Sequence, residues 1–371
     1  MQPKKFSFPI TTLAGTTVRN FLALSKGHRI ERKYRGKMML TFLVSGILEI
    51  FNAYERLVWG RRLKRYKLEE PPIFVIGYWR SGTTFLHTLL CQDPKASYTT
   101  TFQTVFPNLF LSQSWWLMPL ARLIVPSRRP FDNVRLDLDF PQEEEFGLMN
   151  LQPYSIYKFF IFPADFDEII EDELFTANLP EDKKAVWMKQ YREMIAKAAF
   201  NTGGKRFISK NPCNITRLGL IREMYPDAKF IFIHRNPYQA VESLYRFILE
   251  IFAGVQLQET PADFNREKVT LLYEKIIRAY LKDREILGPE NLVELRMEDL
   301  LEDPVKNIRN IYDTFHLDDC EAAIARMQTY IEDTNYSRNG TYRLEPESIR
   351  LVNKYLSDVL EVLGYDKTEA D

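Results

Sequence analysis

The chain of 371 residues lacks several features that mark common classes of protein. Its three cysteines, Cys91, Cys213 and Cys320, are widely spaced and form no Cys-x-x-Cys pair for zinc or redox chemistry. They fit free thiols in a reducing compartment. Fifty basic residues balance fifty acidic ones, so no net charge attracts nucleic acid. We therefore expect a cytoplasmic protein without a nucleic-acid partner.

The sequence also lacks a long hydrophobic run. The N-terminus shows no basic start, apolar run and cleavage site in succession, so no signal peptide is expected. The most apolar window, Met38 to Phe51, is shorter than the ~20 residues that span a bilayer, and it carries Glu49. A buried helix is one interpretation. The other is a helix on the inner face of the membrane, aided by basic residues across 26–67.

The order of patterns indicates an α/β fold. Residues 1–68 are predicted to form a helical extension, and residues 69–371 an α/β domain. Short β-branched and aromatic runs alternate with amphipathic helices, among them those predicted over 214–226 and from Pro237 onwards. This alternation is typical of a parallel sheet with helices on both faces. Residues 92–205 are aromatic, interrupted by proline, and predicted to be a large insertion that covers a site. The predicted strands are "IFVI" (73–76), "KRFISK" (205–210), "AKFIFIH" (228–234) and the "NLVELR" segment (291–296).

The segment "IFVIGYWRSGTTFLHTLL" (73–90) predicts an anion site. It reads as a strand, a turn with Gly77 and Gly82, and a helix start. Backbone N–H groups and the positive helix end then point at one place. Glycine permits the tight turn and the close approach of a ligand. The hydroxyl groups of Thr83 and Thr84 add donors.

This loop lacks the lysine of nucleotide hydrolases, because Thr83 stands at that position. Such enzymes also end a second strand with an aspartate that holds magnesium. Here that strand ends in His234 and Arg235, and magnesium prefers oxygen ligands. A magnesium-dependent triphosphate site is therefore disfavoured, and no metal is expected. The loop carries its cation as Arg80.

These motifs resemble those of the sulfotransferases that use 3′-phosphoadenylyl sulfate (PAPS). "GYWRSGTTFLHTLL" is similar to their 5′-phosphosulfate loop, and "HRNPYQAVES" to their 3′-phosphate motif. Lys210 stands at the family's lysine position, and "RMEDLLEDP" resembles a turn common near the family's C-terminal part. The resemblance spans residues 71–90 and 205–305. It implies a three-layer α/β/α fold with a central parallel sheet, like that of P-loop nucleotide hydrolases.

The resemblance assigns roles to particular residues. The 5′ end of the donor is assigned to Arg80, Ser81, Gly82, Thr83 and Thr84. The 3′-phosphate is assigned to Arg235 and Ser243, with Ser337 and Arg338 of a C-terminal loop as weaker candidates. Arg80 and Lys210 are expected to counter charge on the leaving oxygen. No metal takes part.

The general base is left open. Cytosolic members of the family place a histidine two residues after the lysine, where this chain has Pro212. Other branches use a glutamate, so Glu143 or Glu145 in "FPQEEEFGL" is one hypothesis, although a run of carboxylates is more often a solvated face. His87, one turn into the helix after the loop, is the other; a lone helix histidine is more often a packing residue.

Aromatic residues of the insertion either wall an apolar acceptor pocket or form the insertion's own core. The pocket interpretation predicts a small lipophilic alcohol or phenol as acceptor, such as a sterol, a steroid or another lipid. Resemblance to bacterial members of the family fits this range of acceptors. Two other classes remain open: a P-loop kinase of small metabolites, and a non-catalytic nucleotide-binding or membrane-associated scaffold. The residues concerned are Phe106, Phe110, Trp115, Trp116, Tyr154, Tyr157, Phe159 and Phe160.

Overall fold

The computed structural model describes residues 10–123, 137–334 and 343–369. The chain divides into two compact units, each described here by itself. The sheet unit comprises Glu69–Ser97, Gly204–Arg246 and Asp263–Asp371. The helical unit comprises Met1–Leu68, Tyr98–Gly203 and Phe247–Ala262. The N-terminal extension and most of the insertion, which the sequence pattern treats separately, thus belong to one unit.

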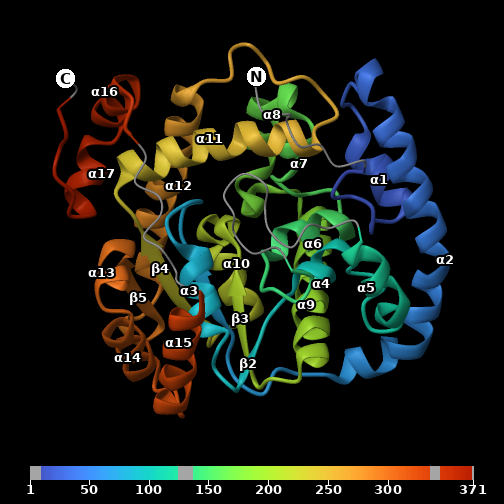
Figure 1. Cartoon of the computed structure of the whole chain (residues 1–371), viewed down its shortest axis with the longest axis horizontal. Helices are drawn as coiled ribbons and strands as arrows, with labels where there is room; N and C mark the ends of the chain where they lie inside the picture. Colours follow the sequence, from blue (N-terminus) through green and yellow to red (C-terminus); the bar gives the residue numbers. More distant parts are fainter. Residues whose placement is uncertain (1–9, 124–136, 335–342, 370–371) are drawn as a thin grey trace. The chain divides into compact units, whose positions relative to one another are not determined.

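The sheet unit is built on five parallel strands in the order β2-β3-β1-β4-β5. Four of them, β2, β3, β4 and β5, are labelled in Figure 1. Ile73 of β1 is in register with Ile208 of β3 and with Lys229 of β4. The predicted α/β class and parallel sheet are confirmed. The strands are β1 (Ile73–Ile76), β2 (Ala96–Ser97), β3 (Arg206–Lys210), β4 (Lys229–His234) and β5 (Leu292–Arg296).

Both faces of the sheet are covered, which explains why its inner strands read as continuous hydrophobic runs. Every residue of β1 is buried. On one face Phe232 of β4 stacks on Tyr280 of α12, with ring centroids 3.8 Å apart. Ile231 and Ile233 point to the opposite face and are equally buried. The helices of this unit are α3 (Thr83–Leu90), α10 (Leu218–Met224), α12 (Arg266–Asp283), α13 (Met297–Glu302), α14 (Pro304–Phe315), α15 (Cys320–Thr334), α16 (Pro346–Tyr355) and α17 (Ser357–Val362).

Of two helices expected between the strands, one differs from the structure and one is confirmed. The expected helix over 214–226 is divided into a 3₁₀ turn (Pro212–Thr216) and α10. The reason is local, because the Asn211 side chain accepts a hydrogen bond from the Cys213 N–H at 3.1 Å and Pro212 begins the turn. The expected helix after Pro237 is confirmed as α11 (Pro237–Val255), which begins in the sheet unit and continues into the helical unit.

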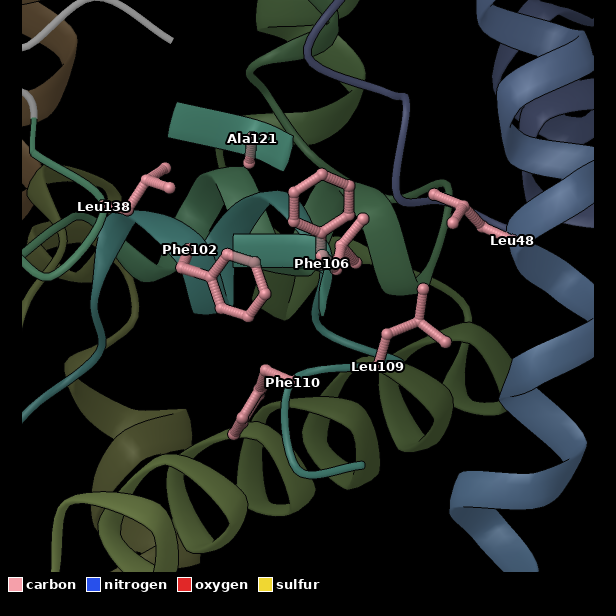
Figure 2. Packing of buried hydrophobic residues seen from close by; sticks show 8 residues of the cluster. Leu48, Phe102, Phe106, Leu109, Phe110, Ala121 and Leu138 are labelled. Atoms are coloured by element: carbon pink, nitrogen blue, oxygen red, sulfur yellow. The ribbon is translucent and has the colours of Figure 1, made fainter. Parts of the chain in front are cut away.

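The described residues of the helical unit fold around an aromatic core. Phe102, Phe106 and Phe110 are buried in it, and Leu48 of α2 joins them (Figure 2). Trp115 is instead exposed. Phe106 and Phe110 are thus core residues, as the second interpretation of the insertion predicts. The helices are α1 (Val18–Ser25), α2 (Arg35–Arg65), α4 (Thr101–Val105), α5 (Ser114–Arg122), α6 (Glu144–Leu151), α7 (Lys158–Ile161), α8 (Phe166–Glu173) and α9 (Glu181–Thr202).

Candidate active site

The loop between β1 and α3 has the geometry of an anion cradle. Gly82 is the N-cap of α3 with φ 95°, in the left-handed region that favours glycine. A Cβ on Gly77 would lie 2.3 Å from the carbonyl oxygen of Ile233, so the loop approaches β4 too closely for a side chain there. Because Gly82 has no side chain to cap the helix, the first N–H groups of α3 can serve a ligand.

Ser81 provides an independent test of this cradle. Its side chain is 1% exposed, and its Oγ has no hydrogen-bond partner among the described residues. A buried hydroxyl without a partner is costly, so such groups usually meet a ligand or an ordered water. The loop therefore fits an oxyanion. The expected positions of Thr83 and Thr84, in the first turn of α3, are also found.

Arg80 joins the loop to the second motif. Its Nε donates to Ser243 Oγ at 3.0 Å, and Ser243 lies on α11, 163 residues further along the chain. Arg80 has φ 67°, a left-handed conformation that costs a residue with a side chain about 1 kcal/mol or more. Strain of this kind is concentrated at functional sites. The parallel arrangement thus brings the two predicted anion motifs together.

Lys210 approaches the same loop from the neighbouring strand. It is the last residue of β3, it is buried, and its Nζ donates to Thr84 Oγ1 at 3.5 Å. Arg235 follows the last residue of β4, on the other side of β1, and is half-buried. Arg80, Lys210 and Arg235 therefore lie where three adjacent parallel strands end, the usual location of ligands in such sheets.

The first residues of α13, directly after β5, support both motifs, a role that was not predicted from the sequence. Glu298 accepts a hydrogen bond from the Asn236 N–H at 3.1 Å, directly after Arg235. A Cβ on Gly82 would lie 2.2 Å from Met297 Sδ, so Met297 packs against the cradle. Both residues belong to the "RMEDL" stretch, so the only advance signal was its resemblance to a family motif.

Ser243 is itself held by a buried ion pair beside it. Glu242 precedes it on α11 and accepts hydrogen bonds from Arg266 at 2.9 Å and Ser348 at 2.7 Å. Burial alone would raise the pKa of Glu242, but these hydrogen bonds and one from Arg246 outweigh it and lower the pKa to about 2. The carboxylate is therefore charged at neutral pH and fixes α11 to α12 and α16.

His87, one of the predicted bases, has the surroundings of a packing residue. It is fully buried in α3, and its Nε2 lies 3.1 Å from the carbonyl oxygen of Ile208, where it must donate. Burial, followed by the nearby charge of Lys210, lowers the pKa of His87 to about 3. The neutral ring is a weak base, although its catalytic role stays an untested prediction.

The candidate carboxylates lie in the helical unit at the start of α6. Tyr157 donates its hydroxyl to Glu143, which is partly exposed. Ser155 Oγ donates to Glu145 at 2.7 Å, and Glu145 is fully buried. A further buried carboxylate, Glu173, was not predicted from the sequence and pairs with Lys158 at 2.6 Å. Burial raises the pKa of Glu173.

Both predicted residues of the C-terminal loop, Ser337 and Arg338, lie outside the described residues. Their assignment to the 3′-phosphate stays a prediction.

Comparison with known proteins shows the family of this chain. A sequence profile of the sulfotransferase family matches residues 71–321. The chain belongs to the sulfotransferase family. As a member it is an enzyme of the transferase class that transfers a sulfuryl group, as the resemblance of its motifs implied. The match covers both anion motifs and the strand that ends in Lys210.

Relatives of similar length support the assignment. The omega-hydroxy-beta-dihydromenaquinone-9 sulfotransferases Stf3 of Mycobacterium bovis and Mycobacterium tuberculosis are each 30% identical over 335 residues, covering 89% of this chain and 84% of theirs. Among solved structures, sulfotransferase STF9 from Mycobacterium avium aligns with a TM-score of 0.72 at 17% identity, over 94% of this chain and 90% of that one. STF1 from Mycobacterium tuberculosis aligns with a TM-score of 0.62 at 17% identity, over 93% and 94%. These structures share the fold of this sulfotransferase.

Proposed function

We propose that this sulfotransferase transfers a sulfuryl group from PAPS to the hydroxyl of a small lipophilic acceptor, giving a sulfate ester and 3′,5′-ADP. The observation that carries the donor assignment is the 3.0 Å contact between Arg80 and Ser243. It unites a cradle for one anionic group with a motif for a second. A donor with phosphates at both its 5′ and 3′ ends requires such a pair.

The two anion motifs hold opposite ends of the donor. Arg80, Ser81 and the N–H groups from Gly82 to Thr84 hold the 5′ end, and Arg235 and Ser243 hold the 3′-phosphate. The guanidinium offers a planar fork of donors suited to phosphate. Bound PAPS supplies the sulfuryl group. Lys210, beside Thr84 at the cradle, offsets negative charge that develops on the leaving oxygen.

A carboxylate of the helical unit is proposed as the general base. Glu143 or Glu145 would accept the proton of the acceptor hydroxyl, a contribution typically worth ~10²–10⁴-fold in rate. The double variant Glu143→Gln, Glu145→Gln is expected to lose turnover by such a factor while still binding 3′,5′-ADP. Glu168→Gln, an exposed position on α8, is the matched control. Wild-type kcat in the double variant would remove the carboxylate hypothesis.

The acceptor class is inferred from the relatives. Stf3 is named for an omega-hydroxylated dihydromenaquinone, a lipid-like substrate. With 30% identity over most of both chains, we infer a lipid alcohol of comparable hydrophobicity here, and keep sterols within that class. An enzyme for such an acceptor would work at the cytoplasmic side of a membrane, in peripheral contact through residues 26–67.

Ligand binding and turnover test the proposal in sequence. Ligand at ~100 times its Kd stabilises a protein by ~2.7 kcal/mol, so a thermal-shift assay detects it. We expect 3′,5′-ADP to stabilise the protein without metal, and ADP to have little effect with or without Mg²⁺. Turnover is then measured with PAPS and a hydroxylated menaquinone analogue, a sterol or a simple phenol. Stabilisation by ADP only with Mg²⁺ would point to a kinase. Binding of 3′,5′-ADP without transfer to any acceptor would favour a scaffold.

A further inference from the structure

Helix α2 has its polar and apolar faces reversed with respect to an ordinary surface helix. Its buried residues are spaced four, three, four and three apart, so they share one face. Four of these five are polar: Thr41, Ser45, Asn52 and Glu55, with Leu48 as the exception. A surface helix of a soluble protein normally buries its apolar stripe and exposes its polar one.

The polar face is held by specific hydrogen bonds within the helical unit. The Thr11 N–H donates to Thr41 Oγ1 at 3.0 Å, and Ser45 Oγ donates to the Leu13 carbonyl at 3.0 Å. Glu55 accepts from the N–H and hydroxyl of Ser112 at 2.9 and 2.7 Å. The orientation of α2 is therefore fixed along its length by contacts that a rotated helix would lose.

The opposite face exposes large hydrophobic side chains, which we name the outer stripe. Met39 is 65% exposed, Ile50 74% and Leu57 81%. Successive members of the stripe are four, four, three, four and three residues apart, so they lie on one face of the helix. At 1.5 Å per residue, the stripe is about 27 Å long. The interpretation of this segment as a buried helix is thus wrong. The outer stripe comprises Met39, Leu43, Ile47, Ile50, Tyr54 and Leu57.

The neighbouring helix α5 extends this apolar surface. Trp116 of α5 contacts Phe51 of α2, with ring centroids 5.6 Å apart, so the two helices lie side by side. On α5 and just after it, Trp115, Leu120 and Leu123 are exposed as well. Monomeric soluble proteins rarely expose contiguous apolar patches of more than a few hundred Å². Exposed apolar surfaces of this kind mark sites of interaction with proteins or membranes, so this one is a candidate docking surface.

The charges of α2 identify the occupant. Both carboxylates of the helix are used on the protein side, because Glu49 accepts from the Val18 N–H at 2.9 Å and Glu55 is buried. The exposed charged residues of α2 are all basic: Arg35, Arg56, Arg61, Arg62, Lys64 and Arg65. A second copy on the same stripe would bring these positive charges together, which disfavours self-association. An anionic lipid surface complements them, because its negative surface potential attracts basic residues near it.

We propose that the outer stripe, with Trp115, Leu120 and Leu123, seats α2 lengthwise on an anionic bilayer surface. Residues Arg32–Arg65 are long and apolar enough to cross a membrane by length and composition. The hydrogen-bonded polar face excludes that arrangement, because lipid cannot replace these partners. The helix lies in the plane of the interface, with its apolar face in the headgroup region. This inference extends the membrane contact included in the proposed function.

Vesicle co-sedimentation of the full chain tests the proposal. The probes are phosphatidylcholine vesicles with and without phosphatidylglycerol, carrying neither donor nor acceptor. We expect binding to the anionic vesicles, weakened by salt and reversed by alkaline carbonate. Ile50→Glu with Leu57→Glu should weaken it at least about tenfold for each side chain, since a buried Leu or Ile is worth more than a factor of ten in partitioning. The matched control is Val362→Glu with Ile286→Glu, exposed positions of the sheet unit.

A second variant and two further measurements complete the test. Replacing Arg61, Arg62, Lys64 and Arg65 by Gln should abolish the preference for phosphatidylglycerol. Stabilisation by 3′,5′-ADP should be the same in all variants, so failure here is distinguishable from failure of the donor assignment. Wild-type protein that stays in the supernatant with both vesicles, or Ile50→Glu, Leu57→Glu protein that binds normally, would overturn the proposal. The proposal would also be overturned if light scattering showed that the wild-type protein is a dimer and that the Ile50→Glu, Leu57→Glu protein is a monomer.

Discussion

The contact between Arg80 and Ser243 leads to a quantitative prediction about donor binding. Arg80→Lys keeps the positive charge but removes the Nε that donates to Ser243 at 3.0 Å. Lysine at φ 67° has the same backbone strain, so the variant isolates the loss of the fork. Hydrogen bonds that involve a charged group contribute about 1.5–3 kcal/mol, and 1.4 kcal/mol is tenfold in affinity. We expect the Kd of 3′,5′-ADP to rise about ten- to hundredfold.

Two ligands separate the two ends of the site. AMP shares the 5′-phosphate with 3′,5′-ADP but lacks the 3′-phosphate. In calorimetric titrations, Arg80→Lys should weaken both ligands, whereas Ser243→Ala should weaken 3′,5′-ADP much more than AMP. Because the two side chains contact each other, the double variant should lose less than the sum of the single losses, with a coupling of about 0.5–3 kcal/mol.

The control is Arg350→Lys, at an exposed position on α16 that should leave both affinities unchanged. Strictly additive losses would show that the two residues are not energetically coupled in binding the ligand. An unchanged Kd of 3′,5′-ADP in both single variants would refute the donor assignment itself.

Three further predictions concern residues around this contact. Lys210→Gln should lower kcat about 10²–10³-fold at saturating donor with a smaller change in the Kd of 3′,5′-ADP, and an unchanged kcat would remove its role at the leaving oxygen. Glu298→Gln should weaken the binding of 3′,5′-ADP by up to about tenfold in titration calorimetry, because the Asn236 N–H loses a charged acceptor. The affinity for AMP should stay unchanged, so an equal loss for both ligands would contradict this prediction. The pKa of His87 is lowered to about 3 in the folded protein, against 6.5 for an ordinary histidine. As the pH falls from 6.5 towards 3, the unfolded chain therefore binds a proton that the folded protein does not, and the free energy of unfolding decreases. His87→Gln should flatten that decline in urea unfolding by up to about 1.4 kcal/mol per pH unit, whereas an unchanged slope would show that the ring is already protonated in the fold.

The inner strands were predictable because both faces of the sheet are buried, so β1 and β4 read as continuous apolar runs. The convergence of Arg80, Lys210 and Ser243 was also predictable in outline, since residues after parallel strands meet at one edge. The two-residue strand β2 was not, because its pairing with β3 depends on residues 110 positions away and leaves no local pattern. The support of Asn236 by Glu298, 62 residues later, is invisible for the same reason.

The reversed face of α2 shows a different limit. The hydropathy of residues 38–51 indicates a helix but not which side faces the protein. That choice is made by the partners of Thr41, Ser45 and Glu55, which lie 30 to 57 residues away. Local pattern therefore predicts the element, and only tertiary hydrogen bonding decides its orientation.

The central position of β1 has a consequence for synthesis on the ribosome. Its partners, β3 and β4, begin at Arg206 and Lys229, more than a hundred residues later in the chain. The ribosome must therefore have synthesised all of α2, and more than a hundred residues after β1, before β1 can pair with β3 or β4. Contacts between such distant segments form slowly, so the apolar helix α2 can meet other molecules outside the ribosome well before the carboxyl edge of the sheet has formed.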